Sequence, residues 1–449
     1  MQSHFYKVLA KNLLAATVVG ALFLTLQLSS RLTTSETEES AEYPADSTYG
    51  NKLISSKNSY ECINPYAQPG FIWMETRTTI DNTTWVPFYG GLLDKQFSQL
   101  WDTKRVPVDK VVNGTRYFPN SFPPNDLFKN APTQWFQLLL KYKNAADAAS
   151  AEEGPGRKAE SVKALRELEK KLYWLKNRSL LVVGDSVDGS LVTHLCNSLE
   201  APLEYGSTNA SNETSIATCN IKEWKLRITH WQLGCVGHRC RAGETIESID
   251  QKWDRYFIPN SGSVMGQSDP APDLVIFQLG LWGVNFFGDQ QRKYVNGKEI
   301  DHSRTLNIRE LAVYTRLLRH IISKLRDIYG YHTPILYRTV ALKNTEEQDA
   351  TALTLDSAAR YACRELDVEI MDFGWLVRGY YSFYSDDVNI DKGPLSTLWV
   401  NMVFWYLFRT QGGVEVRGDL VRTADMDMTT SDAWNMCHDT FMKDLKIRS

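Results

Sequence analysis

One serine of this chain has the sequence setting of a catalytic nucleophile. Residues 180–195 read LLVVGDSVDGSLVTHL, an apolar run that stops at a Gly-Asp-Ser motif and continues with helical spacing. The run predicts a buried strand over residues 180–183, and the spacing predicts a helix over residues 189–199. Ser186 then lies at a helix N-terminus, whose free N–H groups can stabilise the oxyanion formed when a serine attacks an ester. The alternative is that Ser186 or Asp188 only caps the helix.

A serine nucleophile needs a base that accepts its proton and an acid that orients the base. Residues 385–399 read SDDVNIDKGPLSTLW and follow the last predicted strand. Ligands of parallel α/β sheets bind at the carboxyl ends of the strands, so this segment and Ser186 should reach the same edge of the sheet. The segment is therefore the candidate for the acid and the base.

These blocks also carry a family resemblance. VVGDS, the Trp-bearing loop after DLVIFQLG, and DDVN with the following GPLSTLWVN resemble the SGNH (GDSL-type) hydrolases. The resemblance is closer to the PC-esterase branch, with its plant trichome-birefringence-like and fungal capsule O-acetyltransferase-like membrane proteins, and it covers roughly residues 178–410. It implies a serine acyl esterase or O-acetyltransferase acting on glycans, with Ser186 as the nucleophile.

In that family the acid and base form an Asp-x-x-His motif ahead of a Pro-Gly and a Trp-Asn. The resemblance places the Asp on Asp386 and the His on Asn389, with residues 393–394 and 399–401 following at about the right distances. The frame of the motif is present, but the histidine is not. An amide such as that of Asn389 can hydrogen-bond Ser186, but it cannot take its proton near neutral pH.

The oxyanion-hole residues also differ from the family pattern. The family places an Asn after the strand that corresponds to DLVIFQLG, and Gln278 is the best match here. Asn285 lies several residues too far along the chain. Gly234, in WQLGCV, is the candidate backbone donor. We therefore expect Gly234 and Gln278 to form the oxyanion hole.

Another histidine could replace the missing base. The chain has eight histidines, and His238 and His302 lie in loops that could approach the crevice. His230 is predicted to be a buried, hydrogen-bonded core residue. Three functions therefore stay open. One is an active acyl esterase or O-acetyltransferase, and another is a pseudoenzyme of the same fold that binds a glycan or a protein. The third is a structural or scaffolding membrane protein, which only the expected membrane topology favours.

The elements that must position these residues alternate along the chain. Strands are predicted at residues 180–183, 224–231, 273–279, 334–338 and 368–373, and helices at 134–142, 161–176, 189–199, 244–256, 304–329, 346–366 and 395–409. Residues 145–160 read as an exposed loop. The alternation predicts a three-layer α/β/α fold with a mostly parallel, SGNH-hydrolase-like sheet of about five strands.

The N-terminal region predicts a membrane anchor. Residues 12–30 carry no charge and are just long enough to cross a hydrocarbon core of ~30 Å, while Lys7 and Lys11 precede them. A cleaved signal peptide is the alternative. We expect a cytosolic tail over residues 1–11, a single-pass type II anchor, a disordered stem over 31–60, and one lumenal domain over 61–449 with an irregular lead-in over 61–177. The domain would face the Golgi or ER lumen or the cell surface.

Composition and motifs limit the classes of partner and cofactor that the chain is expected to bind. The chain has 50 basic and 53 acidic residues, a net charge of −3, which argues against nucleic acid. The expected partners are a glycan or other acyl-ester substrate and the membrane. No cofactor or metal is predicted, because the Cys and His spacings do not match a zinc site. Five sequons and seven cysteines suit the secretory lumen. A local disulfide within Cys219, Cys235 and Cys240 is expected, with Cys196 as a buried thiol.

Overall fold

The computed structural model describes a large part of residues 62–448. The described residues are 62–68, 70–73, 83–87, 111–112, 115–116, 131–150, 155–206, 216–233, 250–259, 261, 271–280, 306–341, 346–385, 389–390, 393–416, 419–422 and 430–448. The tail, anchor and stem predicted over residues 1–60 lie outside them. Among the helices that are described, none combines the length and the apolar character needed to span a bilayer.

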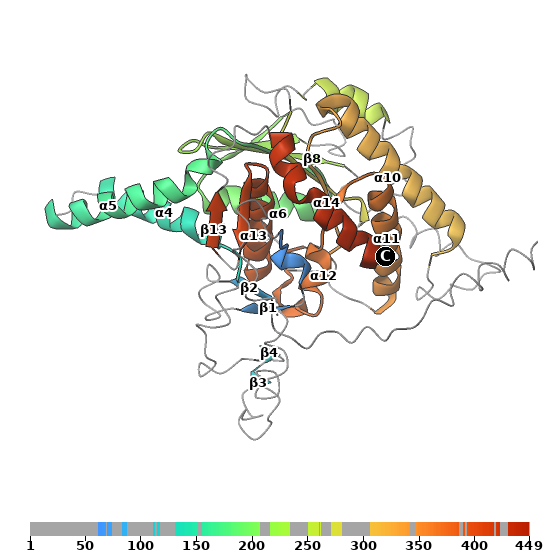
Figure 1. Cartoon of the computed structure of the whole chain (residues 1–449), viewed down its shortest axis with the longest axis horizontal. Helices are drawn as coiled ribbons and strands as arrows, with labels where there is room; N and C mark the ends of the chain where they lie inside the picture. The colour runs from blue at the N-terminus through green and yellow to red at the C-terminus, as the bar shows by residue number, and fades with distance from the viewer. Residues whose placement is uncertain are drawn as a thin grey trace, which may run out of the picture. The chain divides into compact units, whose positions relative to one another are not determined.

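The core of the fold is a seven-stranded, mostly parallel sheet (Figure 1). Its strands, in spatial order, are β11 (Glu369–Met371), β10 (Ile335–Arg338), β9 (Leu274–Phe277), β5 (Ser179–Gly184), β8 (Leu226–Gln232), β7 (Ile216–Ile221) and β6 (Leu203–Tyr205). The first five are parallel and coincide with the five predicted strands. Strand β7 pairs antiparallel with β8, and β6 pairs antiparallel with β7. The expected strand number of about five is thus corrected to seven, since β6 is too short and β7 too continuously buried to give a period-two pattern.

Side chains on β8 show that both faces of the sheet are covered. Neighbouring residues of a strand point to opposite faces. The ring of His230 lies against Gly189 of α6 (Ser186–Ser198). The next residue, Trp231, stacks on Phe257 of the π-helical turn η5 (Trp253–Phe257), with ring centroids 4.7 Å apart. Helix α6 and η5 therefore lie on opposite faces.

The other end of the sheet gives the same three layers. Glu369 of β11 binds Arg409 of α13 (Pro394–Arg409), so α13 covers the same face as α6, which it contacts. Tyr337 of β10 points the other way, and its hydroxyl lies 2.9 Å from that of Tyr314 in α10 (Ile308–Tyr329). Helix α11 (Glu346–Glu365) packs beside α10 (Figure 1). The predicted α/β/α layering is present.

The remaining elements lie outside the central sheet. They are η2 (Pro65–Ala67), β1 (Gly70–Trp73), β2 (Thr84–Pro87), β3 (Val111–Val112), β4 (Thr115–Arg116), α4 (Trp135–Ser150), α5 (Pro155–Leu172), η4 (Tyr173–Leu175), α12 (Phe373–Val377), η6 (Tyr381–Phe383), β12 (Gly413–Val416), β13 (Asp419–Arg422) and α14 (Thr430–Arg448). Among them, α4, α12 and β12 contact α13, all of whose residues are buried. A helix that is apolar all round belongs in the interior of a domain. The lead-in reaches this helix through Asn64, whose side chain donates to Tyr406 Oη at 2.9 Å.

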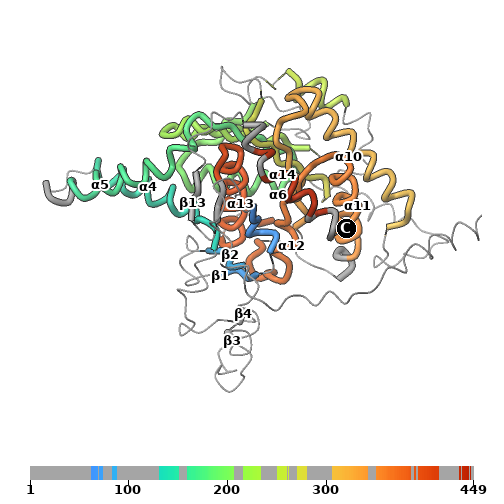
Figure 2. Tube along the Cα trace, in the orientation of Figure 1, coloured from blue at the N-terminus to red at the C-terminus, as the bar shows by residue number. Residues whose placement is uncertain are grey.

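The loop predicted over residues 145–160 is mostly helical. Helix α4 continues to Ser150, and α5 begins at Pro155. The alanines before Ser150 favour helix over loop, and proline is well suited to the first position of a helix. The two helices lie side by side (Figure 2).

Among the described cysteines two disulfides are formed. They correct the expectations for Cys196 and Cys219, while a local bridge between Cys235 and Cys240 stays a prediction. Cys196 of α6 is bonded to Cys219 of β7, so it is not a thiol, and Cys219 does not pair within its own loop. The pairing follows from the layering, because α6 lies across the sheet that contains β7. The second bridge joins Cys62 to Cys437. Cys363 is a buried thiol, whereas Cys235 and Cys240 lie outside the described residues.

A buried charge network closes the β11 edge. Arg409 donates two hydrogen bonds to Glu369, at 2.8 and 3.0 Å. His438 of α14 contacts Glu369 through Nδ1 at 2.8 Å and Asp367 through Nε2 at 2.9 Å. Both ring nitrogens thus face carboxylates, which requires the protonated ring. Burial by itself would lower the pKa of His438, but hydrogen bonds and the charges of the two carboxylates outweigh it and raise the pKa.

The raised pKa predicts a stability that falls in alkaline solution. The contribution of His438 is fully present below the unfolded pKa of about 6.5 and is lost as the pH rises through the higher folded value. We expect the melting temperature to fall as the pH rises above neutrality, and His438→Gln to remove much of this dependence. His332→Gln, at an exposed histidine, is the control and should retain it. Equal pH dependence in the His438→Gln and unmodified chains would contradict the assignment.

Candidate active site

Ser186 lies where the sequence places it, at the start of a helix after a central parallel strand. It is the first residue of α6 and is exposed, while Asp185, Val187 and Asp188 around it are buried. The helix is capped by Asp185, whose Oδ1 accepts from the Val187 N–H at 2.9 Å. Neither Ser186 nor Asp188 is therefore the capping residue, and the exposed hydroxyl stands at the positive end of the helix dipole.

Asp188 folds back beneath the turn. A Cβ atom on Gly184 would fall inside the contact distance of Asp188 Oδ2, so the strand must end in glycine for this carboxylate to fit. Ser186 and Asp188 are two positions apart and point in nearly opposite directions, about 200° around the helix axis. The Asp188 carboxylate thus points into the protein and the Ser186 hydroxyl points outward from the same helical turn.

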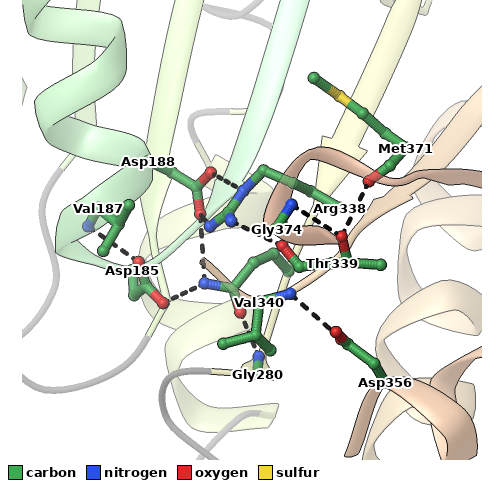
Figure 3. Close-up of polar contacts among 11 residues, drawn as sticks. Asp185, Val187, Asp188, Gly280, Arg338, Thr339, Val340, Asp356, Met371 and Gly374 are labelled. Atoms are coloured by element: carbon green, nitrogen blue, oxygen red, sulfur yellow. Dashed lines mark hydrogen bonds and ion pairs between the residues drawn. The ribbon is translucent and has the colours of Figure 1, made fainter. Parts of the chain in front are cut away.

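The partner of Asp188 is Arg338, the last residue of β10. Arg338 donates from Nε to Asp188 Oδ1 at 2.6 Å and from Nη2 to Asp188 Oδ2 at 2.9 Å (Figure 3). Each side chain is 1% exposed, so the pair is shielded from solvent. The sequence signal for this pair is an arginine at the end of a strand of otherwise apolar residues, because a buried arginine needs an acidic partner.

Gln278 completes the polar cluster at the end of β9. Its Nε2 donates to Asp185 Oδ2, and its Oε1 accepts from the Gly280 N–H (Figure 3). The amide is buried and engaged with the turn. Gly234, the other expected oxyanion donor, lies outside the described residues. The oxyanion hole therefore stays a prediction.

Two groups at the turn, Asp185 and His230, have shifted pKa values. Burial, followed by the charge of Asp188, raises the pKa of Asp185 to about 6, against the opposing effects of Arg338 and two hydrogen bonds. Burial lowers the pKa of His230 to about 4, so its ring is neutral at neutral pH. His230 bonds the backbone of Asp185 and matches the expected buried core histidine.

The expected acid–base segment is described only in part. Asp386 lies outside the described residues. Asn389 is half-buried, and its backbone oxygen accepts from Ser385 N at 3.0 Å and from Ser385 Oγ at 3.1 Å. The following frame residues have structural roles. Gly393 has a φ of 100°, and Pro394 begins α13. The Asn401 side chain accepts from the Phe136 N–H at 2.9 Å, at the start of α4.

The five described histidines have other surroundings than Ser186 Oγ. His194 lies beside the Phe136 ring, His230 is buried under α6, His320 bonds Asp250, His332 is exposed beside Tyr331, and His438 binds two carboxylates. His238 and His302, the two loop candidates, lie outside the described residues. No cluster of His, Cys, Asp or Glu suited to a metal ion occurs among the residues that the structure describes.

The fold and site thus define an α/β protein with an exposed serine at the carboxyl edge of its sheet. No family model matches the chain, and no curated protein matches it. The solved structure of Axe2, an acetylxylan esterase from Geobacillus stearothermophilus, is similar with 14% identity and a TM-score of 0.30, over 52% of this chain and 94% of that one. A catalytic mutant of Axe2 with an aspartate replaced by alanine gives a TM-score of 0.31 at the same identity. A likeness this low describes a partial overlap, so any chemistry assigned to this chain rests on its own residues.

The close approach at Gly184 makes a specific prediction. Gly184→Ala should destabilise the protein by about 1–3 kcal/mol, because the new methyl group displaces Asp188 from its place under the turn. Gly206→Ala is the control, since its nearest neighbour would be Ile216 Cβ at an ordinary 3.5 Å. Denaturant unfolding measures both. A Gly184→Ala chain as stable as the control would show that the turn is packed differently.

Proposed function

We propose that this chain is an SGNH-type serine acyl esterase or O-acetyltransferase by ancestry, acting on glycans, with Ser186 as the nucleophile. The observation that carries the proposal is the exposed Ser186 at the first position of α6, directly after the central parallel strand β5. A hydroxyl there can attack a carbonyl placed at the sheet edge, where ligands of parallel α/β proteins bind. The neighbouring helix N-terminus favours the negative charge that develops.

The reaction has two balanced steps. Ser186 Oγ forms a bond to the acyl carbon, its proton passes to a base, and the ester C–O bond breaks as the base gives that proton to the leaving alcohol. Water or a sugar hydroxyl then gives its proton to the base and attacks the acyl carbon, and the bond to Ser186 Oγ breaks as the serine regains a proton. Water as the acceptor defines a hydrolase, and a sugar hydroxyl defines a transferase. Asp386 is proposed as the orienting acid. The base is the unassigned part, since an amide cannot accept the proton.

A second candidate function follows from Asn389. It occupies the position where the resemblance places the histidine, and the five described histidines have other surroundings. A pseudoenzyme that binds a glycan or a protein at the same edge needs no base. Loss of one triad member lowers turnover by on the order of 10³-fold or more, yet leaves residual activity through binding and the oxyanion hole.

Two substitutions in the full-length chain separate these functions. We expect hydrolysis of 4-nitrophenyl acetate by the unmodified chain to be abolished by Ser186→Ala, and Asn389→His to raise it by about 10- to 10³-fold through the restored base. Ser190→Ala, further along the same helix, is the control. Turnover that survives Ser186→Ala would refute the serine mechanism. Activity that appears only with Asn389→His would leave the pseudoenzyme as the native function.

We also propose a lumenal location, with the chain anchored through residues 12–30. Support comes from the two disulfides, which are typical of oxidising compartments. Asn177 adds to this support, because it is an exposed sequon asparagine in a turn with a φ of 61°.

The location can be tested at Asn177. The chain isolated from its secretory pathway should lose mass on treatment with an N-glycosidase, and Asn177→Gln should remove the equivalent of one glycan. Asn144→Gln, an exposed asparagine outside any sequon, is the control. An unmodified Asn177 in a chain that carries no glycan at all would contradict the lumenal placement.

A further inference from the structure

We infer that Asp188 and Arg338 are positioning residues, which hold the Ser186 turn in register with the end of β10 and with α12. The inference rests on the proposed function and deepens it. Neither residue faces the side on which Ser186 is exposed, so neither touches a substrate. Their effect would act through the backbone of the turn.

The Asp188–Arg338 pair fixes the direction in which Ser186 points. Because Asp188 is held inward by two hydrogen bonds from Arg338, the helix cannot rotate about its axis without breaking them. The serine lies nearly opposite on the same turn, so its outward direction is fixed by the same contact. Gln278 adds a second restraint through Asp185.

Hydrogen bonds also connect the Asp188–Arg338 pair to α12. Arg338 Nη1 donates to the Thr339 carbonyl at 2.9 Å. Thr339 Oγ1 in turn accepts from the Gly374 N–H at 2.9 Å and lies 3.4 Å from the Met371 carbonyl (Figure 3). Gly374 belongs to α12, and the chain runs from there through η6 to Asn389. One series of hydrogen bonds thus joins the nucleophile turn to the segment that leads to the expected acid–base residues.

The Asp188–Arg338 pair contributes fixed geometry more than stability. A buried ion pair often gives no more stability than apolar residues of similar volume, although breaking it is costly. What the fork of an arginine adds is fixed geometry, because two parallel hydrogen bonds set the orientation of the carboxylate. A second pair, Arg409 with Glu369, has the same bidentate form and similar burial. Glu369 is in register with Leu336, two residues before Arg338, so the second pair lies nearer the amino ends of the strands and provides a matched control.

The position of the turn can be tested without measuring ester turnover, through the pKa of a thiol placed at residue 186. In a full-length Ser186→Cys chain, the pH dependence of iodoacetamide alkylation gives the pKa of the new thiol, with the modified peptide identified by mass spectrometry. A thiol at a helix N-terminus has a pKa below the usual value of about 8.5. Cys363 does not interfere, because burial raises the pKa of its thiol.

We expect Arg338→Lys, which keeps the charge and loses the fork, to raise that thiol pKa by roughly one unit and to slow alkylation at pH 7 roughly tenfold. Arg409→Lys should destabilise the fold without moving the thiol pKa. An unchanged pKa in Arg338→Lys, or an equal shift in Arg409→Lys, would overturn the inference. If Arg338→Lys does not fold, Asp188→Glu, which keeps the charge and displaces the carboxylate from the fork, decides by the same criterion. The outcome is separate from that of Ser186→Ala on the ester, which judges the proposed function.

Discussion

The buried pair of Asp188 and Arg338 is the interaction on which the carboxyl edge of the sheet depends. It joins the turn after β5 to the end of β10, across the intervening strand β9, whose Gln278 binds the same turn. It also explains the glycine that ends β5, since no side chain fits between that residue and the carboxylate. Three strands therefore present their ends as one rigid surface, and Ser186 is the exposed residue of the turn within it.

The parts of the fold that follow from local pattern were predictable. The five parallel strands and the long helices carry clear periodicity, and the strand-turn-helix setting of Ser186 follows from them. The antiparallel pair β6 and β7 was not, because its pairing depends on a neighbour rather than on its own alternation. The bridge between Cys196 and Cys219 was not predicted either, since it depends on how a helix crosses a sheet.

In the site, too, some features follow from local sequence pattern and others depend on contacts between distant residues. A motif read along the chain finds Ser186, but the buried partner of Asp188 in the same turn is Arg338, 150 positions from Asp188. No spacing in the sequence encodes that meeting, because it results from the order of the strands. The frame around Asn389 shows that a motif can also reflect folding requirements. Gly393 adopts a left-handed conformation before Pro394, and Asn401 binds the start of another helix, so these residues are accounted for without any chemistry.

The bond between Cys62 and Cys437 has a consequence for biosynthesis. It spans 375 residues, from the first described segment to the last helix. During translation Cys62 is synthesised long before Cys437, so it must stay unpaired, or pair reversibly, until residue 437 has been made. The bridge can therefore close only after every strand of the central sheet has been synthesised, and it then joins the lead-in covalently to the last described helix.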